Sequence, residues 1–204
     1  KLEIYGMNSE MGVDLTPLSY LTNLDFLRIT GVNLDDLLPL GELTELHKLE
    51  LSSSWTLSDL SPLSRLSNLE ELNLSGNRIS DLKPPERLTH LKKLDLTDNQ
   101  LFDLEPLRQL NELTMLNISD NRISDLAPLS NLPQLKEAFL GFNQIQDISI
   151  VSNWECLERL RLEYNQIEDL SPLAELGALR ELSITGNPVA DLSPVSHIDC
   201  VENN

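Results

Sequence analysis

A 22-residue repeat constrains this chain more than any other feature of its sequence. The apolar residues that align at this spacing are Leu74, Leu96, Ile118, Leu140, Leu162 and Ile184. The same alignment gives an asparagine column, Asn77, Asn99, Asn121, Asn143, Asn165 and Asn187. It also gives an aspartate column, Asp14, Asp36, Asp59, Asp81, Asp103, Asp125, Asp147, Asp169 and Asp191. Repeats of this length stack into solenoids, which present one long surface instead of a single deep core. We therefore expect a binding protein rather than an enzyme.

Each repeat predicts one short strand followed by one helical turn, so the predicted fold class is α/β. Apolar and polar residues alternate around Leu72 and Leu74, as in a half-buried strand. Stacked repeats should form one parallel sheet of about nine strands. The inward leucines that we expect to be almost fully buried are Leu72, Leu94, Leu116, Leu160 and Leu182. The segment from Asp125 to Leu129 is too short for an α-helix and favours a 3₁₀ turn. Turns take more room per repeat than strands, so the sheet should be concave and the turns convex.

The two polar columns have structural explanations. An asparagine amide at the end of each strand can bond backbone groups of the following turn. Aspartate is a favoured N-cap of the helical turn that follows it. A row of nine carboxylates also suggests calcium binding. Calcium loops, however, gather their ligands at short alternating spacing, whereas these residues occur once per repeat. We therefore expect neither a metal nor a cofactor.

Departures from the regular spacing predict local irregularities. One extra residue near Ser53 and Trp55 predicts a bulge or widened turn. Ile4 and Ile29 are 25 residues apart, which predicts an enlarged loop from Gly6 to Val13.

The two cysteines are predicted to be free. Cys156 and Cys200 lie 44 residues apart, which is two repeats, and so should occupy equivalent positions. Val201 would then share the column of Leu179. Two strand spacings put the cysteines roughly 10 Å apart, which is too far for a disulfide.

Charge and motifs exclude several function classes. The chain has 15 basic and 33 acidic residues, a net charge of −18. Such a surface repels nucleic acid and anionic membranes, whereas it permits a basic protein partner. No apolar run is long enough to span a bilayer. The histidines, His47, His90 and His197, occupy different positions within the repeat, so no nucleophile–base pair is expected to converge.

The candidate protein-binding residues lie at outward strand positions. Five of the nine aromatic residues occur there or one position further on: Tyr5, Phe26, Phe139, Phe142 and Tyr164. The last three cluster on neighbouring repeats beside Arg159 and Arg161. Aromatic residues and arginine are enriched at interface hot spots. We expect the two arginines to be available to an acidic or aromatic group of a partner. The alternative for Phe142 is a packing role, with its ring folded over the next repeat.

The complete repeat resembles that of the internalin class of bacterial leucine-rich repeat proteins. The unit Asn-x-Ile-x-Asp-Leu-x-Pro-Leu-x-x-Leu is clearest from Asn121 to Leu132 and recurs from Asn165. The resemblance covers essentially the whole chain. It implies a right-handed, gently curved solenoid with short 3₁₀ helices outside. It also implies a secreted or bacterial cell-surface setting and a protein ligand on the concave face, held by exposed aromatic residues.

Two features of that class are not recognisable here. Internalins carry a helical cap before the repeats and an immunoglobulin-like domain after them. We therefore expect residues 1–204 to form one array of about nine repeats, cut within a repeat at both ends, as in part of a longer protein or in a heavily trimmed one. A monomer is favoured. The alternatives are an intracellular, cytoplasmic regulatory or scaffold subunit that docks on an enzyme such as a phosphatase, and the recognition half of a larger effector.

Overall fold

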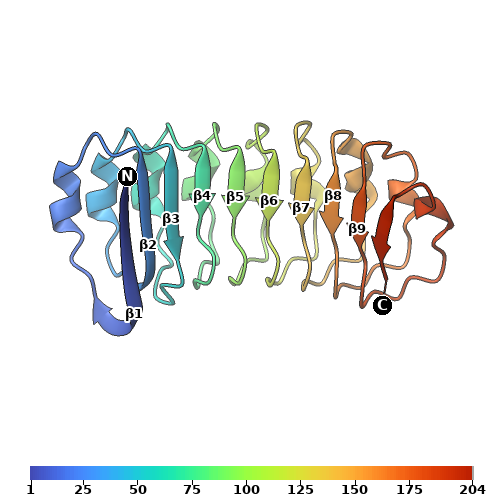
Figure 1. Ribbon diagram of the computed structural model, residues 1–204, viewed down its shortest axis with the longest axis horizontal. Helices are drawn as coiled ribbons and strands as arrows, with labels where there is room; N and C mark the ends of the chain where they lie inside the picture. Colours follow the sequence, from blue (N-terminus) through green and yellow to red (C-terminus); the bar gives the residue numbers. More distant parts are fainter. Residues whose placement is uncertain (204) are drawn as a thin grey trace.

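The computed structural model is a solenoid with one sheet along its length (Figure 1). It describes residues 1–203, without the side chains of residues 7–11, 84 and 86. In this described part, ten strands form one parallel sheet in sequential order, and the expectation of about nine was one too few. The 3₁₀ segments lie behind the sheet, and the two termini lie at opposite ends. The predicted class, a leucine-rich repeat solenoid with a curved parallel sheet and short turns opposite, is confirmed.

The strands and turns alternate throughout. The strands are β1 (Leu2–Gly12), β2 (Phe26–Asn33), β3 (Lys48–Ser52), β4 (Glu71–Asn73), β5 (Lys93–Asp95), β6 (Met115–Asn117), β7 (Glu137–Phe139), β8 (Arg159–Arg161), β9 (Glu181–Ser183) and β10 (Cys200–Glu202). The 3₁₀ segments are η1 (Thr16–Tyr20), η2 (Leu38–Glu42), η3 (Ser61–Arg65), η4 (Pro84–Arg87), η5 (Glu105–Leu107), η6 (Ala127–Leu129), η7 (Ser149–Asn153), η8 (Ser171–Leu173) and η9 (Ser193–Val195).

The apolar columns form a continuous core along the array. The five leucines singled out from the sequence, Leu72, Leu94, Leu116, Leu160 and Leu182, are at most 2% exposed, as predicted. Their strands pair in the expected register: Leu72 lies opposite Leu94, and Leu94 lies opposite Leu116. This register directs the residues on either side of each leucine to the opposite face of the sheet.

The asparagine column joins neighbouring repeats through the backbone. The amide nitrogen of Asn165 donates to the carbonyls of Leu140 and Leu162, each at 3.0 Å. Its side-chain oxygen accepts the Ile145 N–H at 3.0 Å. Ser54 replaces asparagine in this column, and its hydroxyl accepts the Leu34 N–H at 2.9 Å. The column therefore satisfies buried backbone groups that the sheet leaves unpaired, which confirms its predicted structural role.

The aspartate column stabilises the turns from one position earlier than predicted. Within the described chain, each of the nine carboxylates accepts the N–H of the residue two positions later, as Asp125 does from Ala127 at 2.8 Å. The N-cap itself is the intervening leucine, Leu126 in this repeat, because the 3₁₀ segment begins one residue further on. The aspartates thus form Asx-turns that hold the first N–H of each segment, except at η4, where Asp81 accepts the N–H of the N-cap residue Lys83.

Two sequence expectations concern irregular segments. Ser53 and Trp55 both have positive φ angles, in agreement with the widened turn predicted there. The enlarged loop predicted from Gly6 to Val13 is wrong. Strand β1 instead continues to Gly12, with register shifts against β2 that absorb the extra length.

The last repeat also departs from its predicted register. Val201 lies opposite Leu182, not in the column of Leu179, because β10 joins the sheet three residues early. Cys200 therefore opens a strand and is not equivalent to Cys156. Both cysteines are nevertheless exposed and free.

Candidate functional site: the outward face of the sheet

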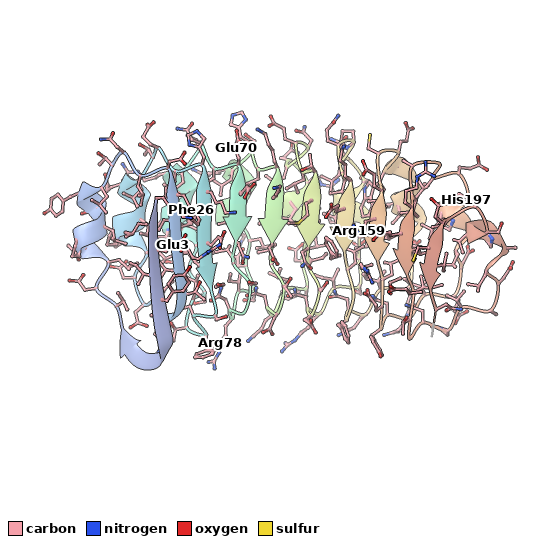
Figure 2. The ribbon with its side chains drawn as sticks, viewed as in Figure 1. Glu3, Phe26, Glu70, Arg78, Arg159 and His197 are labelled. Carbon is pink, nitrogen blue, oxygen red and sulfur yellow. The ribbon has the colours of Figure 1, made fainter. Side chains whose placement is uncertain are left out.

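The outward strand residues, together with the residue three positions after the end of each of the strands β4 to β9, form one surface, called here the sheet face. Figure 2 shows two of its residues, Phe26 near the first strands and Arg159 towards the other end. Because the leucine columns are committed to the core, side chains that can contact a partner through the sheet must lie on this face.

The first half of the sheet face is an internally neutralised network of charges. The Lys48 Nζ lies 3.1 Å from a Glu50 carboxylate oxygen and 2.8 Å from one of Glu71. The Lys93 Nζ lies 2.9 Å from the second Glu71 oxygen. Hydrogen bonds from Lys48 and Lys93 lower the pKa of Glu71, and the bond to Glu71 raises the pKa of Lys48. These lysines are therefore already engaged within the chain.

The first aromatic candidates, Tyr5 and Phe26, belong to this network. Cations of Lys1, Arg28 and Lys48 lie 5.1, 5.4 and 5.6 Å from the Phe26 ring centroid. Such distances are within the range of cation–π attraction. The Tyr5 hydroxyl donates to Glu3 at 2.6 Å. Phe26 is half-buried under charged side chains, so this end of the face offers less free apolar surface than the sequence suggested.

The arginines at the other end are also paired within the chain. Arg159 forms two hydrogen bonds to Glu181, at 2.7 and 3.1 Å. Arg161 reaches across β9 to Glu202 at 2.6 Å. The Ser183 side chain between these strands is 1% exposed, and its hydroxyl has no hydrogen-bond partner in the described structure. The sequence predicts that both guanidinium groups are free for a partner. In the structure both are instead paired with carboxylates of the chain itself.

Outward charges are sparse at β6 and β7, where the only charged outward strand residue in the described structure is Glu137, 3.7 Å from the Arg159 guanidinium. The uncharged outward residues of these two strands are Met115, Asn117 and Phe139, all half-buried, and Asn117 lies opposite Phe139 in the sheet. A hollow of about 200 Å³ extends from β3 to Met115, but most of its lining residues are charged ones such as Lys48, Glu71 and Lys93. Partly exposed apolar side chains in the middle of the face are therefore those of Met115 and Phe139.

The most unusual backbone on the sheet face is a row of left-handed residues directly before the asparagine column. Positive φ angles recur at Gly76, Asp98, Asp120, Phe142, Tyr164 and Gly186. The conformation closes the tight turn after each strand. Glycine adopts it without steric strain, whereas a bulky side chain does so rarely.

Two aromatic rings occupy this row side by side. Phe142 (φ 56°) and Tyr164 (φ 52°) stack with ring centroids 4.6 Å apart and an interplanar angle of 23°. They remain 48% and 53% exposed. A Cβ atom on Gly186 would lie 2.7 Å from Cδ1 of Tyr164, so only glycine leaves room for the tyrosine ring there. Phe142 does fold over the next repeat, but it packs on an exposed ring and lies outside the buried core.

Two carboxylates precede the rings in the same row. Asp98 and Asp120 are exposed, and across the described residues neither side chain forms an ion pair or hydrogen bond. Partial burial and the neighbouring Asp98 charge raise the pKa of Asp120. The two negative charges therefore repel each other without an internal counter-charge.

The candidate catalytic and metal-binding residues do not converge. His47 pairs with Asp25 at 3.0 Å, and His90 pairs with Glu112 at 3.3 Å, on different repeats. His197 lies near the last turn (Figure 2). Among the described residues, no group of three histidine, cysteine, aspartate or glutamate side chains could hold a metal ion. No helix in that part of the chain has both the length and the apolar character needed to cross a bilayer.

The fold and its repeats define a leucine-rich repeat solenoid, and comparison with known proteins agrees. The family described as "Leucine Rich repeats (2 copies)" matches residues 67–109, 111–154 and 157–197. The chain is 34% identical to the Listeria monocytogenes internalin inlF, with a TM-score of 0.88 over 97% of this chain and 60% of that one. It is 32% identical to internalin C2 of the same bacterium, with a TM-score of 0.87 over 90% and 82% of the two chains.

A more distant match points to the same fold. A leucine-rich repeat protein of Leptospira interrogans is 26% identical, with a TM-score of 0.75 over 93% of this chain and 57% of that one. No curated protein sequence matches the chain. The chain belongs to the leucine-rich repeat family and, within it, to the internalin-like proteins. It spans 60% of the length of the internalin inlF.

Sequence reasoning found the aromatic candidates but missed their backbone conformation. The signal was present, because Gly76 and Gly186 stand in the same column as Phe142 and Tyr164. A column in which glycine alternates with other residues indicates a left-handed turn position.

Proposed function

We propose that the chain is a non-enzymatic protein-binding module that recognises a protein partner through its sheet face. The leucine-rich repeat fold, typically an interaction scaffold, supports this general role. The Phe142–Tyr164 stack supports the location, because two large rings are held half-exposed in a strained conformation. Phe139 extends the same apolar surface onto β7. We assign the centre of the interface to these three residues.

The Listeria internalins support a secreted or bacterial cell-surface setting and an adhesive or other interaction role. We propose this setting for the protein to which residues 1–204 belong. The chain acts within it as a single repeat array, monomeric until its partner binds. Tyr5, Phe26, Arg159 and Arg161 form the flanks of the interface, where their ion-pair and cation–π contacts fix the shape of the face.

A capture experiment with matched variants tests the proposal. The immobilised wild-type chain and the variants Phe142→Gly and Tyr164→Gly are exposed to the same host-cell and bacterial surface extracts, and retained proteins are quantified by mass spectrometry. Glycine suits these positions, because Gly186 has the same conformation. Each substitution should weaken binding of the specific partner by at least about 1 to 2 kcal/mol, as loss of an aromatic hot spot does. Phe139→Ala should act in the same direction.

The control is Phe102→Ala, which removes a 64% exposed ring beside the 3₁₀ segment η5. This variant should retain the partner at the wild-type level. Loss of binding with Phe102→Ala but not with Tyr164→Gly would move the interface to the turn side and refute the assignment.

A further inference from the structure

The row of residues with positive φ, called here the left-handed row, is acidic at one end and aromatic at the other, and this difference constrains the chemistry of the partner. From β5 to β8 it consists of Asp98, Asp120, Phe142 and Tyr164, one per repeat. Backbone hydrogen bonds hold the repeats in register: the Asp120 N–H donates to Gly141, and the Phe142 N–H donates to Glu163. At one strand spacing per repeat, the row spans roughly 15 Å. Two carboxylates thus stand directly beside two stacked rings.

No cation within the described structure neutralises the acidic half of the row. The basic residues of the sheet face are paired with other carboxylates: Lys93 with Glu71, for example, and Arg159 with Glu181. Arg122 lies two residues after Asp120 in the chain and makes no ion pair with any described residue. The chain as a whole carries a charge of −18. An approaching cation is therefore attracted by the long-range field and finds unpaired oxygens at Asp98 and Asp120.

The aromatic half selects a different group. The open faces of Phe142 and Tyr164 favour an apolar side chain, or the flat face of another ring. The Tyr164 hydroxyl adds a hydrogen-bonding atom, since no partner for it is present among the described residues. The two halves adjoin, so a single short segment of a partner can contact both.

Resting on the proposed function, we infer that the partner presents a segment with lysine or arginine next to an aromatic or large aliphatic residue. Its cation binds between Asp98 and Asp120, and its apolar side chain packs on the Phe142–Tyr164 stack. This arrangement sets the direction of the segment along the row, with the cation towards β5. It also predicts that binding weakens as ionic strength rises, because exposed charge pairs are screened by salt.

Peptide selection on the intact chain tests the inference. A phage library of random peptides is selected on the wild-type chain, and enriched peptides are synthesised for affinity measurements. The inference requires enriched peptides with a lysine or arginine adjacent to an aromatic or aliphatic residue. Their affinity should fall about tenfold for the Asp98→Asn/Asp120→Asn double variant, and by at least as much for Phe142→Gly/Tyr164→Gly. Circular dichroism confirms that each variant is folded.

The matched control removes the same two charges elsewhere on the surface. Asp35 and Asp199 are exposed, and Asp35→Asn/Asp199→Asn removes two negative charges, as the test variant does; Asp199 lies 3.8 Å from Arg180 and so also loses an exposed ion pair. This control should bind the peptides as the wild type does. An equal loss of affinity in the control would reduce the effect to net charge and overturn the inference. Enriched peptides without a cation that still require Phe142 and Tyr164 would overturn it while leaving the proposed function intact. Peptides insensitive to both double variants, or no enrichment at all, would overturn both.

Discussion

At the scale of single residues, folding stability does not explain why Phe142 and Tyr164 occupy left-handed positions. The left-handed conformation costs about 1 to 2 kcal/mol per non-glycine residue, and an aromatic stack contributes about 0.5 to 1.5 kcal/mol beyond its buried area. Each ring leaves about half of its surface in water. Strain therefore offsets much of the gain from contact. The proposed role in binding accounts for large rings in a column where Gly76 and Gly186 fit without strain.

Asp120 allows the same reasoning to be tested through stability. Partial burial and Asp98 raise the pKa of its carboxyl group, so the folded state disfavours the charged form. A raised pKa in an acid means that stability is lost as pH rises through the folded pKa. Asp120→Asn should therefore raise the melting temperature at pH 7. The gain in the free energy of unfolding should be no more than about 0.5 kcal/mol, because solvent screens the carboxylate.

Thermal melts at several pH values check this expectation. The difference between Asp120→Asn and the wild type should shrink towards pH 3, where the wild-type carboxyl is protonated. Asp35→Asn, at an exposed site, should show a smaller change at pH 7. A destabilised Asp120→Asn protein would mean that this carboxylate makes a favourable contact in the folded chain.

At the scale of the repeat element, the asparagine column does more than close its own turn. Asn165 is 7% exposed and bonds backbone atoms of its own repeat and of the preceding one. An alanine there leaves one buried N–H and several carbonyls without their partner. Each unsatisfied buried polar group costs about 1 to 3 kcal/mol. We therefore expect Asn165→Ala to lower the free energy of unfolding by roughly 2 to 4 kcal/mol.

Chemical denaturation of the two proteins measures this difference. Asn68→Ala is the matched control, because the Asn68 amide also bonds a carbonyl of the preceding repeat, that of Thr44 at 3.0 Å, but at an exposed site. Its loss should stay below about 1 kcal/mol. Similar effects of the two substitutions would show that burial of the asparagine column contributes little.

The elements also show how far the sequence could be read. Periodicity predicted the sheet, its register and the buried leucines, because a column of apolar residues at constant spacing has only one way to face the core. It failed at Cys200, where the last repeat reaches the sheet three residues early. The 22-residue spacing could not predict this register, because the last repeat is shorter than the others between β9 and β10.

The candidate site was predictable only in part, for a different reason. Outward strand positions follow from alternation, so Phe139 and Arg159 could be placed on the sheet face. Which charges pair with which could not, because long side chains choose among several neighbours. Arg161 reaches Glu202, 41 residues away. Only the glycines of the left-handed row, Gly76 and Gly186, indicated its backbone conformation in the sequence.

At the scale of the whole molecule, excess negative charge and the aspartate turns act in different pH ranges. The 33 acidic residues exceed the 15 basic ones, so self-repulsion destabilises the folded array at pH 7. Protonation of some carboxylates relieves it as the net charge approaches zero, roughly between pH 4 and 5. Below that range the chain becomes positive and repulsion returns.

The aspartate carboxylates of the turns should make stability fall more steeply at acid pH. Hydrogen bonds from Ser149, Ser171 and Ser193 lower the pKa of Asp147, Asp169 and Asp191 below the ordinary value of 3.8. A lowered folded pKa contributes stability that is present above pH 3.8 and lost as pH falls through the folded value. The melting temperature should therefore be highest near pH 5 and should fall steeply below about pH 4.

Melting curves from pH 7 to 2 at constant ionic strength test this profile. Asp169→Asn supplies the specific comparison, because its amide oxygen can still accept the Ser171 N–H, at 2.8 Å in the wild type, but does not titrate. This variant should lose less stability than the wild type between pH 4 and 2. If the two acid limbs coincide, the turn carboxylates contribute nothing measurable to acid unfolding. If the wild type is most stable at pH 7 or above, self-repulsion is not the dominant charge effect in the array.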